Sequence, residues 1–303
     1  MNISINSEID HIKSVIIHKP NNEQKYVMPE HLIEWLPGGN QLKHNPNYLL
    51  LDDLLNPKKV QKEHQQLSKV LEYFTGKENC LDVITLLSDI LKQENIRNSL
   101  IEDCISLEES NYNFIFQEHI KQKIKSFNIP HIIFTILTGR SYNDKKIKYF
   151  QNPIPNLIFT RDIAVVIGKT LILTWGKRQV RRRENLIAKY IFTYHPFFSK
   201  INIYNFHEHH PNLNLEGGDI IVFNEKIICI GLSERTSKES IKVILPIIFD
   251  EGFNIVYAID LPKQRSIMHL DTIFNRINNN EVIIFPPIFD STHIKYINSK
   301  IYC

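Results

Sequence analysis

The sequence has few of the features that would indicate a membrane protein or a partner of nucleic acid. No apolar run approaches the length of a membrane span, and residues 1–9 have no apolar core of the kind found in signal peptides. The 36 basic and 33 acidic residues leave a net charge of +3, which is too small to indicate a nucleic acid or a membrane surface as partner. We therefore expect a cytoplasmic protein that binds neither.

Cysteine is also scarce, and no two cysteines have the C-x-x-C spacing of redox or zinc motifs. The four are Cys80, Cys104, Cys229 and Cys303. Cys229 falls within an apolar stretch that predicts a buried strand. This usage favours reduced thiols over disulfides.

Two polar clusters resemble functional motifs but have simpler interpretations. Residues 207–210 (HEHH) precede Pro211 in a predicted loop and lack the helical i, i+4 spacing of zinc-binding histidines, so we expect no metal site there. Residues 177–183 (KRQVRRR) resemble a nucleic-acid patch, but a charge run at the start of a helix is usually a solvated face.

The sequence contains a repeated unit. Residues 155–162 are interpreted as a strand that ends at Asp162. Residues 163–167 and 170–175 then form two β-rich runs around Gly168 and Lys169, which predicts a hairpin. A helical pattern follows and stops at Pro196, and residues 201–206 predict another strand. The unit is therefore ββαβ.

The same order recurs twice. Asp219 precedes predicted strands at 220–223 and 227–230, a helix that begins at an N-cap Thr236 and ends at Gly252, and a strand at 255–259. Asp271 precedes predicted strands at 272–274 and 282–285. The aspartates are 57 and 52 residues apart (219 − 162 and 271 − 219). This period predicts an α/β fold, a propeller of pseudo-repeated ββαβ units.

The N-terminal part predicts a first unit followed by an insertion. A strand at 15–18 precedes a helix capped by Asn56, and residues 80–84 predict the closing strand. The apolar positions of that helix, predicted to form its buried stripe, are Val60, Leu67, Val70, Leu71 and Phe74. Several short helices are expected from 86 to about 137. The predicted domains are a first propeller unit (1–85), a helical insertion (86–140), and the second, third and incomplete fourth units (141–303).

Carboxylates at equivalent positions of repeated units suit a particular kind of ligand. A guanidinium group offers five N–H donors in a plane, which carboxylates match in bidentate fashion. Glu216 stands beside two glycines that let the backbone approach a ligand closely. His269, two residues before Asp271, can move protons near neutral pH. A guanidinium substrate is implied.

Four motifs occur in the order found in one known family. PNLIFTRD (155–162), LEGGD (215–219), ERTS (234–237) and MHLDT (268–272) resemble those of arginine deiminases, in the guanidino-group-modifying superfamily. The resemblance implies a five-bladed αβ propeller, a hydrolase acting on the C–N bonds of linear amidines, and no metal or organic cofactor. It implies conversion of L-arginine and water to L-citrulline and ammonia through a covalent cysteine intermediate. The predicted helical insertion favours arginine deiminases over dimethylarginine hydrolases.

The resemblance also implies residue roles. Asp162 and Asp271 match the aspartates that grip the guanidinium, and Glu216 and His269 match the pair that orients it and moves protons. Arg181 and Arg235 match arginines that bind the α-carboxylate, which favours free L-arginine over agmatine as the small-molecule substrate. The residues expected to line the pocket are Leu50, Asn156 and Phe159. Homo-oligomerisation is left open.

The sequence departs from the family pattern after Asp271. In the family the nucleophilic cysteine lies near the C-terminus, behind a glycine-rich loop, and neither has a counterpart here. Only 32 residues follow Asp271 (303 − 271), so the fourth unit is expected to be incomplete. Cys303, at a free end, is not expected to replace the nucleophile. Two interpretations remain: a deiminase whose nucleophile is absent from these residues, or a catalytically inactive arginine-binding or regulatory protein.

Overall fold

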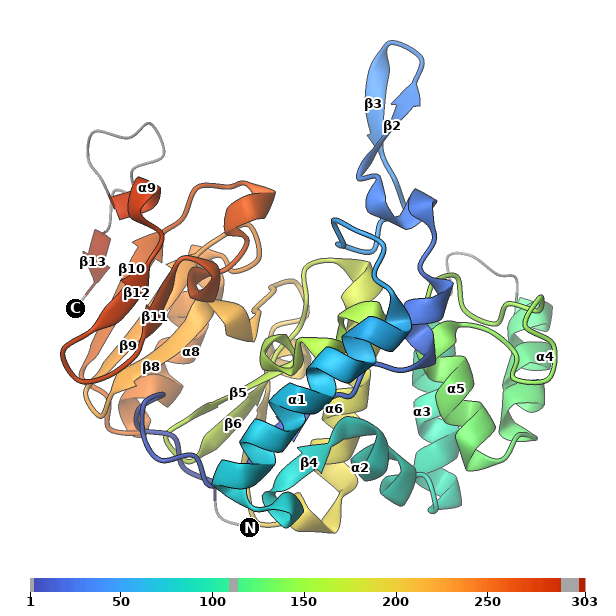
Figure 1. The fold of residues 1–303 in the computed structure, drawn as a ribbon, viewed down its shortest axis with the longest axis horizontal. Helices are drawn as coiled ribbons and strands as arrows, with labels where there is room; N and C mark the ends of the chain where they lie inside the picture. The colour runs from blue at the N-terminus through green and yellow to red at the C-terminus, as the bar shows by residue number, and fades with distance from the viewer. Residues whose placement is uncertain (1–2, 109–113, 290–299, 303) are drawn as a thin grey trace. The chain divides into compact units, whose positions relative to one another are not determined.

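The computed structural model describes residues 3–108, 114–289 and 300–302, and the chain forms two compact units (Figure 1). We call them the β unit and the helical unit. The β unit comprises Met1–His11, Arg161–Gln179 and Pro196–Cys303, and the helical unit comprises Ile12–Thr160 and Val180–His195. Each unit is described by itself.

The first sheet of the β unit confirms the predicted hairpin. Strand β5 (Ala164–Ile167) runs antiparallel to β6 (Thr170–Leu173), and β7 (Asn202–Asn205) lies parallel to β6 on its other side. Gly168 in the turn has φ 56°, a conformation that residues with a Cβ adopt rarely. A short helix, α7 (Phe206–His209), follows β7.

The second sheet repeats this order. Strands β8 (Ile220–Asn224) and β9 (Ile227–Leu232) form an antiparallel hairpin, and β10 (Ile255–Asp260) lies parallel to β9. Strand β13 (Lys300–Tyr302) completes the order β13-β10-β9-β8. Helix α8 (Lys238–Asp250) links β9 to β10. Its N-cap is Ser237, one residue after the predicted Thr236, because the Ser237 side chain accepts the Ser240 N–H.

The third repeat is a hairpin alone in its sheet. Strand β11 (Phe274–Arg276) pairs antiparallel with β12 (Val282–Ile284), and the short helix α9 (Pro286–Phe289) follows. Buried apolar side chains join this hairpin to the second sheet; they are Ile221, Cys229, Leu261, Ile267, Leu270, Ile273 and Ile288.

The strand predicted at 155–162 is wrong. The segment forms two 3-10 turns, Pro155–Ile158 and Thr160–Asp162. Proline fixes φ near the helical value at the first position, and the Phe159 N–H bonds to the Asn156 carbonyl at 2.9 Å, which closes a tight turn. Equivalent turns, Gly217–Asp219 and Leu270–Thr272, precede the other two hairpins.

The helical unit begins with a parallel pair of short strands, β1 (Val15–Ile17) and β4 (Cys80–Asp82). The predicted closing strand at 80–84 is shorter than expected because Asp82 caps the next helix by accepting the Thr85 N–H at 3.2 Å. The helices expected after residue 86 are present. They are α2 (Val83–Ile90), α3 (Glu94–Ser106), α4 (Phe114–Lys125) and α5 (Ile129–Thr138). Helix α6 (Arg182–Tyr194) completes the unit.

A hairpin between β1 and the first long helix was not predicted. Strands β2 (Trp35–Gly38) and β3 (Gln41–His44) pair antiparallel within the helical unit. The residues on them are mostly exposed. No buried face therefore imposes the alternation by which such strands are recognised in a sequence.

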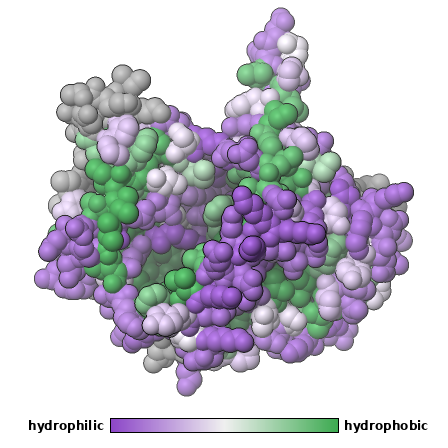
Figure 2. Space-filling view, viewed as in Figure 1, coloured by the Kyte–Doolittle hydropathy of each residue, from purple (hydrophilic) through white to green (hydrophobic). Residues whose placement is uncertain are grey.

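Helix α1 (Pro57–Thr75) confirms its predicted cap but not its predicted face. Asn56 accepts the Lys59 N–H, yet Leu67, Val70 and Phe74 are 52%, 54% and 57% exposed. The buried positions are instead Ser68 and Thr75, whose hydroxyls bond to carbonyls one turn earlier and so need no other partner. Much of the outer surface along α1 is hydrophilic (Figure 2). None of the described helices is long and apolar enough to cross a membrane.

Candidate functional site

The turns before the hairpins bring acids and an imidazole together in the β unit. Gly217 and Gly218 make the approach possible. A Cβ on Gly218 would lie 2.7 Å from His269 Nδ1 and 2.8 Å from Asp162 Oδ1, and one on Gly217 would collide with the Arg161 carbonyl. Any larger side chain would therefore displace the groups gathered here.

His269 lies between two carboxylates. Its Nε2 is 2.8 Å from Glu216 Oε2, and its Nδ1 is 3.6 Å from Asp162 Oδ1, in a position where the residue is only 4% exposed. Burial lowers the pKa of His269, but the bond to Glu216 and the charge of Asp162 outweigh it and raise the pKa to about 9. The ring therefore holds two protons at neutral pH.

Glu216 is almost completely buried. It is 1% exposed, and its Oε1 accepts the Lys177 N–H at 3.0 Å and lies 3.6 Å from Arg235 Nη1. Arg235, itself 3% exposed, also lies 3.4 Å from Glu234. These donors stabilise a buried anion, as burial of an ionised group requires.

Asp271 is held by a residue to which the sequence assigned no role. Arg161 Nε is 3.2 Å from Asp271 Oδ2, and Arg161 Nη2 donates to Glu8 Oε1 at 2.8 Å and to the Ile220 carbonyl at 2.7 Å. Burial raises the pKa of Asp271 to about 6, while the charges of Arg161 and His269 act in the opposite direction. At neutral pH Asp271 is therefore mostly ionised.

Asp219 occupies the same place in its turn as Asp162 but has a different environment. It is fully buried, accepts the Leu270 N–H at 3.1 Å and the Ser233 hydroxyl at 2.6 Å, and so joins the second repeat to the third. Burial raises the pKa of Asp219 to about 7. This carboxylate stabilises the fold rather than facing a ligand.

The remaining predicted residues lie in the helical unit. Arg181 is buried and donates from Nε to Glu184 Oε2 at 2.8 Å and from Nη2 to the Asn156 carbonyl at 3.0 Å. Asn156 in turn donates from Nδ2 to the Leu49 carbonyl at 2.5 Å. These bonds fix the turn that carries Asn156. Phe159, which follows this turn, is 52% exposed.

Leu50 has an unusual backbone. Its φ is 62°, in the left-handed region, and it is the one described residue other than glycine with a positive φ. Strain of this kind is found most often at functional positions.

Known proteins match most of the chain in sequence. Residues 47–301 match the family described as Arginine deiminase. The chain belongs to this family.

Among curated relatives, the arginine deiminase of Staphylococcus haemolyticus is 29% identical over 307 residues, and that of Listeria monocytogenes serotype 4b is 29% identical over 305. The alignments cover 95% and 94% of this chain and 70% and 69% of the relatives.

Solved structures match less of the molecule. The N-terminal domain of ArgZ, an arginine dihydrolase from cyanobacteria, superposes with a TM-score of 0.37 at 21% identity, over 45% of this chain and 46% of that one. A dimethylarginine dimethylaminohydrolase from Pseudomonas aeruginosa, complexed with citrulline, gives 0.34 at 23% identity, over 43% and 47%. The assignment to the family rests on the sequence matches alone.

In this arginine deiminase family member, the predicted residues form two groups. Asp162, Glu216, Arg235, His269 and Asp271 gather in the β unit. Asn156 and Arg181 are bonded to each other in the helical unit, and Leu50 follows the residue to which Asn156 donates. Sequence reasoning missed Arg161, although it lies in the motif PNLIFTRD, and it also missed Glu8.

The described cysteines of this deiminase-family chain are not placed among these acids. Burial raises the pKa of the Cys104 and Cys229 thiols to about 12, and burial also raises the pKa of Cys80. Thiols of this kind are unreactive. Cys303 lies outside the described residues. Nor do the described histidine, cysteine and carboxylate side chains converge in any group of three suited to a metal.

Proposed function

We propose that the protein binds the guanidinium of L-arginine at the carboxylates of Asp162, Glu216 and Asp271 in the β unit. We propose also that it takes part in the hydrolysis of L-arginine to L-citrulline and ammonia. The observation that carries the proposal is the buried contact of His269 with Glu216 and Asp162 beside the ionised Asp271. Membership of a hydrolase family supports the reaction class.

The carboxylates suit a guanidinium ligand. Asp162, Glu216 and Asp271 supply three carboxylate acceptors, which lie among the positive charges of His269, Arg161 and Arg235. A guanidinium group brings a delocalised positive charge with N–H donors on both edges, which can bond to two carboxylates at once. The product, citrulline, carries an uncharged urea group in place of the guanidinium, and carboxylates attract a urea less strongly.

His269 suits the proton transfers of the reaction. In the proposed sequence a thiolate attacks the guanidinium carbon, the C–N bond breaks, and ammonia leaves with a proton supplied by the imidazolium. The neutral ring then removes a proton from a water molecule, which attacks the same carbon and releases the thiol. The described cysteines do not occupy this place, so the thiol is assigned to no described residue.

Arg235, whose Nη1 lies 3.6 Å from Glu216, is predicted from the resemblance to bind the substrate carboxylate. Arg181, with Leu50, Asn156 and Phe159, keeps the role implied by the resemblance as a prediction. If Arg235 binds the carboxylate, agmatine should bind more weakly than arginine, and Arg235→Ala should remove most of that difference.

The test is calorimetric titration with L-arginine, combined with a colorimetric citrulline assay. Asp271→Asn should weaken arginine binding by about 2 to 4 kcal/mol, because it removes one charge-assisted pair. Equal affinity of wild type and Asp271→Asn would remove Asp271 from the site. Because no described residue supplies the thiol, arginine binding without citrulline is expected of these residues alone, whereas a protein that does not bind arginine would refute the proposal.

A further inference from the structure

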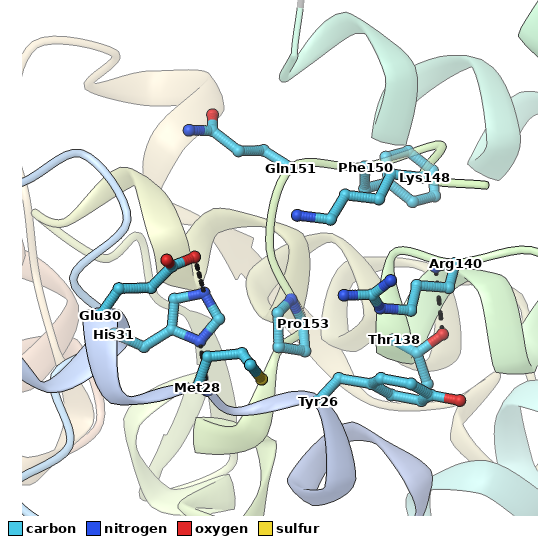
Figure 3. Close-up of a pocket in the computed structure, with 10 residues that line it drawn as sticks. All are labelled: Tyr26, Met28, Glu30, His31, Thr138, Arg140, Lys148, Phe150, Gln151 and Pro153. Atoms are coloured by element: carbon cyan, nitrogen blue, oxygen red, sulfur yellow. Dashed lines mark hydrogen bonds and ion pairs between the residues drawn. The ribbon is translucent and has the colours of Figure 1, made fainter. Parts of the chain in front are cut away.

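A pocket lies within the helical unit (Figure 3). It has a volume of about 140 Å³, and it is formed by the segment before the β2–β3 hairpin and by the residues that follow helix α5. Its lining includes Tyr26, Met28, Glu30, His31, Thr138, Arg140, Lys148, Phe150, Gln151 and Pro153. None of these residues belongs to the predicted arginine site.

Two cations meet at this pocket. Arg140 and Lys148 are direct partners in an isolated antiparallel bridge, and both head groups point into the pocket, opposite His31 and Glu30 (Figure 3). Like charges directly opposite each other across a strand pair are destabilising unless something neutralises them. Arg140 is oriented by a bond from Nη1 to the Lys145 carbonyl at 2.8 Å and lies over the Tyr26 ring at 4.9 Å. No described residue forms an ion pair or side-chain hydrogen bond with Lys148.

The imidazole of His31 adds a neutral donor. Its Nδ1 accepts the Met28 N–H at 2.9 Å, which leaves the proton of the neutral ring on Nε2. Burial lowers the pKa of His31, and the charges of Lys148 and Arg140 lower it further, although Glu30 acts in the opposite direction. The ring therefore offers an N–H without adding a third charge.

Glu30 is the one acid of the pocket. Its Oε1 is 3.8 Å from His31 Nε2, and its side chain is 63% exposed. This loose, solvated contact can be exchanged for a ligand oxygen at little cost. The single negative charge of Glu30 does not neutralise the two positive charges of Arg140 and Lys148.

We propose that this pocket binds a small phosphorylated compound through its phosphate dianion. Two negative charges match Arg140 and Lys148, and three oxygens can accept from the guanidinium, the ammonium and the His31 N–H. Both negative charges of a phosphate lie on one group, which matches the directly opposed Arg140 and Lys148, whereas the charges of a dicarboxylate lie apart.

The experiment titrates the protein with inorganic phosphate and with glycerol 3-phosphate, by calorimetry at pH 8 and at an ionic strength held constant with KCl. Lys148→Met should weaken binding of both probes by about tenfold or more, the loss expected for one charge-assisted contact. Lys146→Met is the matched control. Lys146 is an exposed lysine of the same loop that does not line the pocket, so this variant should bind as wild type does.

Thermal unfolding without phosphate separates binding from stability. Relief of the opposed charges should leave the midpoint of Lys148→Met equal to or above that of wild type, and phosphate should raise the midpoint of wild type and Lys146→Met only. The proposal is overturned if Lys148→Met binds phosphate as wild type does, or if KCl alone reproduces the effect. A preference for succinate over both phosphate probes would overturn the choice of ligand.

Discussion

Replacing His269 tests whether the imidazole is charged in the folded protein. His269→Gln keeps an N–H donor near Glu216 but removes the group that titrates. The pKa of His269 is raised to about 9, compared with about 6.5 in an unfolded chain, so protonation favours the folded state. The stability that protonated His269 contributes is fully present below pH 6.5 and is lost as the pH rises through 9.

The size of the effect follows from the shift. A difference of about 2.5 pKa units corresponds to about 3 kcal/mol, of which about 2 kcal/mol is lost between pH 7 and pH 9.5. Two other groups titrate below this window. The pKa values of Asp219, about 7, and Asp271, about 6, are also raised, so the stability that each contributes is lost as the pH rises from about 4 to those values.

The assay is urea unfolding of the β unit at pH 7 and pH 9.5. Trp175, which is 7% exposed, reports on this unit, and a Trp35→Phe background removes the signal of the other tryptophan, in the helical unit. Between the two pH values, the background protein should lose about 2 kcal/mol more stability than the same protein with His269→Gln.

The control is His11→Gln, which changes an exposed histidine of the β unit and should leave the pH dependence unaltered. If His269→Gln has the same pH dependence as its background, His269 is neutral in the folded state. The proton assigned to it in the reaction would then have to come from elsewhere.

Three further substitutions test the contacts of individual residues. Arg161→Gln removes the charge that lowers the pKa of Asp271, so calorimetry should show a larger loss of arginine affinity at pH 6 than at pH 8; equal losses would contradict the pairing. Gly218→Ala places a methyl group 2.7 Å from His269 and should lower the free energy of unfolding in urea by about 1 to 3 kcal/mol. An unchanged unfolding midpoint would mean that the turn can move to accommodate the methyl group without loss of stability. Leu50→Gly removes the strain of a positive φ, so the thermal unfolding midpoint should be unchanged or higher while arginine binding weakens. A lower midpoint would mean that the Leu50 side chain contributes to packing instead.

Features set by neighbouring residues were predicted from the sequence. The hairpins at 164–173 and 220–232 follow from apolar, β-rich runs on either side of short turns, and the helix caps at Asn56 and near residue 237 follow from side chains that bond to nearby N–H groups. The spacing of Asp162, Asp219 and Asp271 predicted equivalent positions in repeated units, but not the 3-10 turns in which they lie.

Features set by distant residues were not predicted. Arg161 contacts Glu8, 153 positions away, and no local pattern indicates that partner. Most of the predicted apolar stripe of α1 is exposed, while Ser68 and Thr75 are buried with their hydroxyls bonded to carbonyls of their own helix, and tertiary packing decides which face is covered. The different environments of Asp162 and Asp219 likewise depend on which residues surround each turn.

The β11–β12 hairpin has a consequence for handling the protein in solution. Its two strands pair with no other described strand, and the outer residues Val282, Ile283 and Ile284 are 41%, 60% and 39% exposed, within a hydrophobic surface visible in Figure 2. A short apolar edge of this kind can template intermolecular strand addition at high concentration. Pro286 and Pro287 limit the hazard, since neither has an N–H to continue the ladder beyond Phe285.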